Sequence, residues 1–104
     1  IENTQQRIAW ARTRLRAVLQ GIQPKDLRRF MVRVFQDPSI APAFQTAPAS
    51  LNNHHAYPGG LMVHSAEVAW TVYQWLRDDP NHGVATAAAL LHDIAKTRTL
   101  TAGM

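Results

Sequence analysis

Apolar residues recur every three to four positions along most of this chain, which is the spacing of amphipathic helices. One such stretch runs from about residue 5 to 20 and stops at Gly21. Pro24 suits the first turn of a second stretch, which Asp37-Pro38 terminates. Residues 40–44 predict a short further turn of helix. The apolar positions of the two stretches are Ile8, Ala11, Leu15, Val18, Leu19 and Ile22, then Leu27, Phe30, Met31, Val34 and Phe35.

The second half of the chain follows the same pattern after a break. Residues 45–58 show little periodicity and contain two prolines, so we expect a loop. A helix is predicted over about 60–77 and a turn over 78–83. The last helix, over 84–96, is nearly apolar all round, which predicts a central place in the fold. We expect its residues Leu90, Leu91 and Ile94 to be buried. Since no strand-like alternation is present, the predicted class is all-α.

The length of 104 residues fits one small helical domain or a fragment of one. We expect a single unit over 1–104, with an N-terminal helical subregion at 1–44 and a motif-bearing region at 45–104. Both ends look cut, so further domains of the same polypeptide are expected. The absence of cysteine excludes disulfides and thiolate zinc sites and fits the cytoplasm. No apolar run approaches the ~20 residues that cross a bilayer, so no membrane contact is expected.

Eleven basic and seven acidic residues give a net charge of +4, which modestly favours nucleic acids or nucleotides as partners. The first helix carries four arginines on its other faces. These predict either a strip that contacts nucleic acid or, more ordinarily, a solvated surface. Trp10 suits the core or a docking face, and His82 suits an exposed turn. The four arginines are Arg7, Arg12, Arg14 and Arg16.

The most informative chemistry is the pair His92-Asp93, which lies in a run of core-type residues. Burying an unpaired carboxylate or imidazole costs several kcal/mol, roughly the range for polar burial. A metal ion would compensate both groups together. The alternative is a helix end where both side chains reach solvent.

Further residues extend this pattern. His64 is set in another apolar helical run, and Lys96 lies four residues beyond His92, on the same face of a continuous helix. Lys96 could hold a phosphate oxygen, or it could be a solvated cation at a helix C-terminus. His54 and His55 suit contact with a phosphate or a second metal, or anchoring of the loop by hydrogen bonds. Gly59-Gly60 would let backbone approach a ligand, or make the turn into the helix.

His64, His92-Asp93 and Lys96 together resemble the HD-domain metal-dependent phosphohydrolases. The sequence HHAYPGG at 54–60, followed by LLHDIAK at 90–96, extends the resemblance to about residues 22–104. Two subgroups are most similar: the TraI-type HD domain of relaxase-like proteins, and the 3′→5′ exoribonucleases that join an OB-fold to an HD domain. Ala95 replaces the usual glycine, which a helix accepts at least as well.

The resemblance implies an HD-domain helical bundle, of which this chain is the N-terminal part. It also implies that His64, His92 and Asp93 are metal ligands, with a fourth ligand, an aspartate, expected beyond Met104. Two imidazoles and a carboxylate suit Mn²⁺, Fe²⁺, Co²⁺, Ni²⁺ or Zn²⁺ better than Ca²⁺.

The implied function is a metal-dependent phosphohydrolase that cleaves nucleic-acid or nucleotide phosphodiesters through a metal-bound hydroxide. Asp93 and Lys96 are then the catalytic residues, the second by stabilising charge on the phosphate. We expect the 104-residue piece alone to be inactive. The alternatives are a non-catalytic HD-like module that docks nucleic acid or protein in a larger relaxase-like polypeptide, and a nucleotide monophosphatase.

Overall fold

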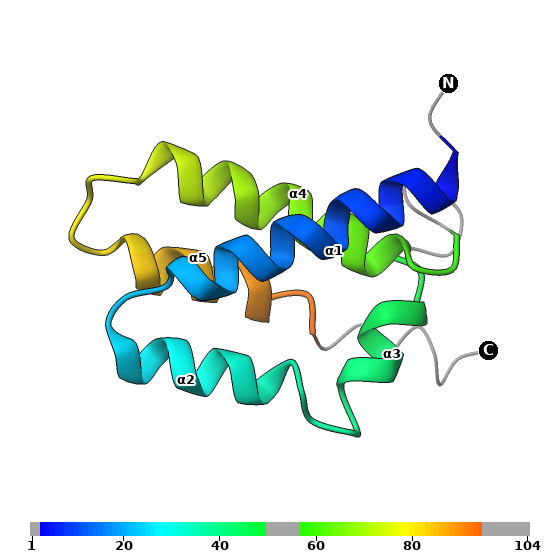
Figure 1. Ribbon diagram of the computed structural model, residues 1–104, viewed down its shortest axis with the longest axis horizontal. Coiled ribbons are helices and arrows are strands. Elements are labelled where there is room, and N and C mark those ends of the chain that lie inside the picture. Colours follow the sequence, from blue (N-terminus) through cyan, green and yellow to red (C-terminus); the bar gives the residue numbers. More distant parts are fainter. Residues whose placement is uncertain (1–2, 50–56, 95–104) are drawn as a thin grey trace.

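The computed structural model describes residues 3–49 and 57–94, and these form five helices (Figure 1). Within those ranges no residue is in a strand, so the predicted all-α class is confirmed. None of the described helices is both long and apolar enough to cross a membrane. The helices are α1 (Thr4–Gly21), α2 (Lys25–Val34), α3 (Ala41–Thr46), α4 (Gly60–Trp75) and α5 (His82–Leu91).

The start of α1 is fixed by a reciprocal pair of hydrogen bonds. The Asn3 side chain accepts from the Gln6 backbone at 2.8 Å, and the Gln6 side chain accepts from the Asn3 backbone at 3.2 Å. Together they satisfy two backbone donors that the helix itself leaves unpaired. The end of α1 at Gly21 is as predicted, and a side chain there would collide with the ring of Tyr73.

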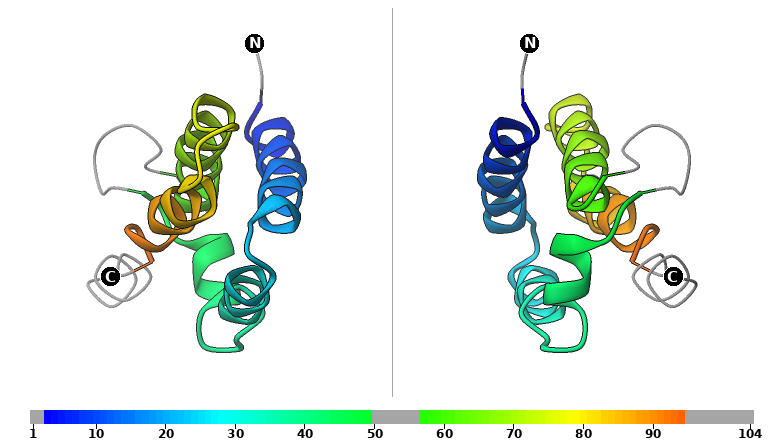
Figure 2. Two further views of the ribbon diagram at one scale, coloured as in Figure 1. Left: turned by 90° about the vertical axis from the view of Figure 1, so that its left-hand side faces the viewer. Right: turned by 90° about the vertical axis from the view of Figure 1, so that its right-hand side faces the viewer.

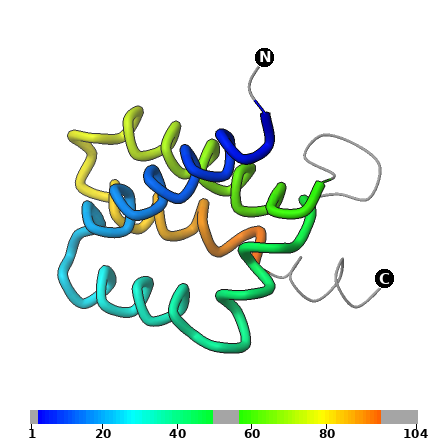
Figure 3. Tube along the Cα trace, turned by 45° about the vertical axis from the view of Figure 1, so that its right-hand side comes forward, coloured from blue at the N-terminus to red at the C-terminus, as the bar shows by residue number. Residues whose placement is uncertain are grey.

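The helices form two hairpins that turn at the same end of the molecule. Figure 3 shows α1 leading into α2, and α4 leading into α5, through turns on one side. Seen end-on, α1 and α4 lie side by side (Figure 2). Of the described helices, α4 packs against α1, α3 and α5, so it is the central element. The prediction that the last helix would be central was therefore wrong.

The core lies along α4 and the faces that surround it. Small residues on α4 and α5, among them Ala66, Ala69 and Ala87, are buried in it. Larger side chains from α1, α2 and α3 complete the packing, and α1 turns every third or fourth residue inward as its sequence predicts. The larger buried residues are Leu15, Val18, Ile22, Met31, Phe44, Leu61, Met62, Val63 and Leu90.

Helix α5 is shorter and more exposed than its composition predicted. It ends at Leu91 instead of continuing to residue 96, and His92 caps it with a backbone bond to the Ala88 carbonyl. Leu90 is fully buried, whereas Leu91 is 37% exposed and Ile94 is partly buried. The expectation that Leu91 is core was wrong, because only one face of α5 meets the neighbouring helices and adjacent residues point about 100° apart.

The beginning of α5 is held by close packing. A Cβ atom on Gly83 would overlap the carbonyl oxygen of Gln23, in the connection between α1 and α2. His82 is half-buried instead of being a simple surface residue: its Nε2 lies 3.0 Å from the Tyr73 carbonyl oxygen, and its ring packs against that of Tyr73. The contact of Gly83 with Gln23 joins the two hairpins at their turns, and the contact of His82 with Tyr73 joins α5 to α4 within one hairpin.

The neighbours Leu90 and Leu91 allow a matched test of the packing of α5. We expect Leu90→Ala to lower the free energy of unfolding by about 2–5 kcal/mol, because it leaves a cavity in the core. Leu91→Ala should cost clearly less, because that side chain is already partly in water. Urea unfolding followed by circular dichroism measures both. Equal losses would contradict the packing described here.

Gly83 provides a test of how the hairpins meet. In a helix, alanine is favoured over glycine by about 1 kcal/mol, so propensity alone predicts that Gly83→Ala stabilises the protein. We expect the opposite, since the new methyl group would overlap the Gln23 backbone. Val84→Ala is the control, because Val84 is 60% exposed and should change stability by less than about 0.5 kcal/mol. A stabilised Gly83→Ala protein would show that the two turns do not touch.

Candidate metal centre

The α4–α5 hairpin brings the predicted ligands together. His64 lies in the second turn of α4, and His92 and Asp93 directly follow the last turn of α5. Because the two helices run in opposite directions, the start of α4 and the end of α5 meet at the same end of the molecule (Figure 3). Residues 28 positions apart in sequence are thereby placed side by side.

The three side chains meet at one carboxylate oxygen. Asp93 Oδ2 lies 3.3 Å from His64 Nε2 and 3.3 Å from His92 Nε2. One ligand atom from each residue lies within 4.8 Å of the other two. Ligand atoms about 2.1 Å from a shared ion, at tetrahedral angles, lie roughly 3.4 Å apart. The two 3.3 Å spacings to Asp93 Oδ2 match this value, so each imidazole could share an ion with the carboxylate.

Exposure differs sharply across the group. The Asp93 side chain is 3% exposed, whereas those of His64 and His92 are 31% and 54% exposed. The carboxylate thus closes the inner side of the group, and the two imidazoles border its solvent side.

A hydrogen bond from the His92 ring fixes its tautomer, and so determines whether the nitrogen that faces Asp93 carries a proton or a lone pair. Its Nδ1 lies 2.6 Å from the Ala89 carbonyl oxygen, and because a carbonyl only accepts, Nδ1 donates. In the neutral imidazole, Nε2 then carries a lone pair and faces the carboxylate oxygen. Two acceptors in this position attract a cation. Histidines that bind metals usually donate their other N–H to a carbonyl or carboxylate in this way.

The sequence left two alternatives for His92-Asp93: a buried pair compensated by a metal ion, and a helix end where both side chains reach solvent. Each alternative describes one of the two residues. The pair does lie at a helix end, and His92 reaches solvent there. Asp93 does not, because it turns inward beneath the two imidazoles. The role of the Ala89 carbonyl was missed, although its place three residues before His92 could have suggested it.

Other candidate residues fall outside the part of the chain that the structure describes. They are Lys96, His54 and His55. The argument that placed Lys96 on the same face as His92 assumed one continuous helix, and α5 ends at Leu91. Gly59 is described: it has a left-handed conformation with φ of 89°, and it begins α4. A Cβ there would press on Ile8, so the glycine makes the turn into the helix, as one of its two interpretations predicted.

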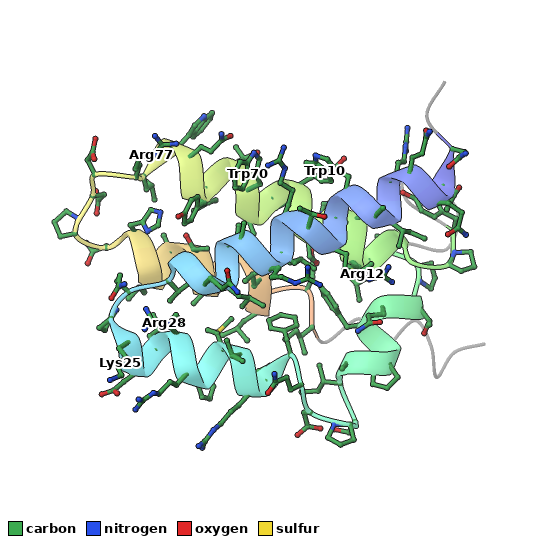
Figure 4. All side chains as sticks on the ribbon, viewed as in Figure 1. Trp10, Arg12, Lys25, Arg28, Trp70 and Arg77 are labelled. Atoms are coloured by element: carbon green, nitrogen blue, oxygen red, sulfur yellow. The ribbon has the colours of Figure 1, made fainter. Side chains whose placement is uncertain are left out.

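The arginines of α1 do not form a single strip. The guanidinium of Arg14 lies between two indole rings, 5.7 Å from the centre of Trp10 and 4.5 Å from that of Trp70. Figure 4 shows both tryptophans along the border of α1 and α4, and Arg12 on the other side of α1. Arg14 is therefore committed to cation–π packing, and Trp10 belongs to the contact between α1 and α4.

Comparison with known proteins places this chain in a family. A curated relative, the dihydroneopterin 2′,3′-cyclic phosphate phosphodiesterase of Methanocaldococcus jannaschii, is 30% identical over 98 residues, which cover 80% of this chain. The chain spans only 39% of that relative's length. No solved structure matched the chain. Residues 11–79, about two thirds of the chain, match the model of the TraI_2 family, described as "Putative helicase". The chain therefore belongs to the TraI_2 family, within the HD-domain superfamily.

Proposed function

We propose that this chain is the ligand-bearing part of a metal-dependent phosphohydrolase that acts on nucleotide or nucleic-acid phosphodiesters. The observation that carries the proposal is the shared position of Asp93 Oδ2, 3.3 Å from the Nε2 atoms of His64 and His92. The bond from His92 Nδ1 to the Ala89 carbonyl supports it, because that bond leaves the facing nitrogen able to bind a cation.

His64, His92 and Asp93 would hold a divalent ion of the group Mn²⁺, Fe²⁺, Co²⁺, Ni²⁺ or Zn²⁺. When bound, such an ion polarises a phosphoryl oxygen and makes a bound water more acidic. The protein's part is to fix the donors. The Ala89 carbonyl orients the ring of His92, and the buried Asp93 supplies negative charge from the inner side. A fourth ligand, an aspartate beyond residue 104, completes the proposed set.

Substrate binding falls to the solvent side of the group, where both imidazoles are partly exposed. We assign Lys96 to the stabilisation of charge on the phosphate oxygens, and His54 or His55 to contact with the phosphate or a second metal. The name of the Methanocaldococcus relative supports a phosphodiester as the bond cleaved, in that protein a cyclic phosphate. A nucleoside 2′,3′-cyclic phosphate is therefore a reasonable first substrate to test beside RNA.

A second candidate is a non-catalytic module that docks nucleic acid or protein within a larger polypeptide. The family description, "Putative helicase", favours it, because a helicase binds nucleic acid. The two candidates differ in the remainder of the protein. An aspartate on a later helix near the three ligands would favour the enzyme, and its absence would favour the module.

Metal binding can be tested on the chain itself. With three protein ligands, it should bind Mn²⁺ or Ni²⁺ weakly, and His64→Ala or His92→Ala should weaken binding by more than about 10-fold, since even changes to the partners of ligands have that effect. Calorimetry and manganese paramagnetic resonance measure the affinity. Asp78→Asn is the control, because it removes an exposed carboxylate in the turn at the other end of the hairpin. Equal loss in all three variants would mean that the ion binds without a single site formed by the two histidines.

Catalysis must be tested in the full-length protein that carries the downstream aspartate. Asp93→Asn should abolish phosphodiester cleavage without unfolding the domain, because the inner ligand is lost. Lys96→Ala should retain the metal and slow the reaction by about 10²–10³-fold, as for loss of one group that stabilises an oxyanion. Asp78→Asn, in the exposed turn before α5, should leave the rate unchanged.

The substrates to compare are adenosine 2′,3′-cyclic phosphate, a short RNA and adenosine monophosphate, with manganese added. Cleavage of the monophosphate alone would replace the phosphodiesterase by a monophosphatase. Full activity of the Asp93→Asn protein, with contaminating nucleases excluded, would refute the assignment and favour the docking module.

A further inference from the structure

A cleft of about 460 Å³ lies among α1, α2, α3 and α4, away from the histidine–aspartate group. Met62 lines it from α4, and His64 is two residues further along the same helix. Residues two apart in a helix point about 200° away from each other, so the cleft and the metal centre lie on opposite sides of α4. The proposed hydrolase does not account for this cleft.

The floor of the cleft is apolar and partly aromatic. Leu15, Phe44 and Met62 are buried beneath it, and the ring of Phe35 meets that of Phe44 edge to face at 5.0 Å. The volume falls in the range of about 300–1,000 Å³ typical of sites for small organic ligands.

The rim of the cleft is positive. Arg12 and Arg16 lie one turn apart on α1, both exposed and both lining the cleft. Within residues 3–49 and 57–94 no carboxylate pairs with either guanidinium, and neither makes a hydrogen bond. Like charges four residues apart in a helix repel each other. Arg14 differs, because its charge is already placed between two indoles.

The residues that line the cleft include no aspartate or glutamate. A smaller cleft adjoins it along α2, shares Gln20, Val32 and Gln36 with it, and adds Arg29 and Arg33 to the positive surface. It too has no acidic lining residue. The pair of clefts is therefore complementary in charge to an anion.

Three exposed glutamines complete the rim: Gln20, Gln36 and Gln45. A primary amide both donates and accepts hydrogen bonds, so these residues suit a ligand with polar edges on a flat ring. A fatty-acid anion would contact the arginines and the apolar floor, but its alkyl chain would make no hydrogen bonds with the amides.

We infer that this cleft is a second, metal-independent site that binds a nucleoside phosphate, with the base over the Phe35–Phe44 floor and the phosphate on Arg12 and Arg16. Charge-assisted hydrogen bonds from two guanidinium groups would hold the phosphate. The inference does not depend on the proposed hydrolase, because no residue of the cleft belongs to the metal group.

The test uses the chain labelled with ¹³C at its methionine methyl groups and titrated with adenosine diphosphate in the presence of EDTA. Met62 lines the cleft, whereas Met31 is fully buried and does not. We expect the nucleotide to shift the Met62 signal and leave that of Met31 in place. Inorganic phosphate and adenosine should each bind more weakly, because each has only half of the recognised groups.

The decisive variant is Arg12→Gln/Arg16→Gln, which should weaken nucleotide binding at least 10-fold and leave Mn²⁺ binding unchanged. The matched control is Lys25→Gln/Arg77→Gln, which loses the same charge at exposed positions outside both clefts (Figure 4). It should change affinity less than about twofold. Equal losses in both variants, an unmoved Met62 signal, or tighter binding of decanoate than of the nucleotide would overturn the inference. Failure of the metal experiments would leave it untouched.

Discussion

The candidate site depends on a buried carboxylate at the end of a short helix, and the arrangement of the helices places two histidines around it. Asp93 is 2% exposed, and two imidazole nitrogens lie 3.3 Å from its Oδ2. An ionised carboxylate taken out of water needs positive charge or a donor beside it, and a cation shared with the two imidazole nitrogens would supply that charge. The fold brings these two histidines, from separate helices, to one oxygen atom.

The α4–α5 hairpin is what brings these side chains together. At its turn, His82 of α5 packs on Tyr73 of α4, which sets how far α5 extends back along α4. Gly83 packs there against the Gln23 backbone of the α1–α2 connection. The register of α5 against α4 is thus decided at one end of the hairpin, and the position of Asp93 is its result at the other end.

Much of this arrangement could be predicted from the sequence, and the failures have physical causes. Helix spacing, Gly21 and Asp37-Pro38 located four of the five helices within a few residues, because local signals act on local structure. The trio of His64, His92 and Asp93 was found by residue type, and the structure brings its members together. The end of α5 was misplaced because an apolar run indicates burial and not helix length, and Leu91 was misassigned for the same reason. The split of the α1 arginines depended on Trp70, which is 56 residues from Arg14 and beyond any local pattern.

The site is divided between two helices that are joined only by a turn, and this division has a thermodynamic consequence. A ligand held by His64 on one side and by His92 and Asp93 on the other can bind only when α4 and α5 are docked. Any ion that prefers the docked state adds its binding free energy to the stability of the hairpin, by about 2.7 kcal/mol at a hundredfold excess over Kd. Local unfolding of α5 and release of the ion are then thermodynamically coupled, so that each favours the other. The concentration of free metal would set how often this end of the molecule opens.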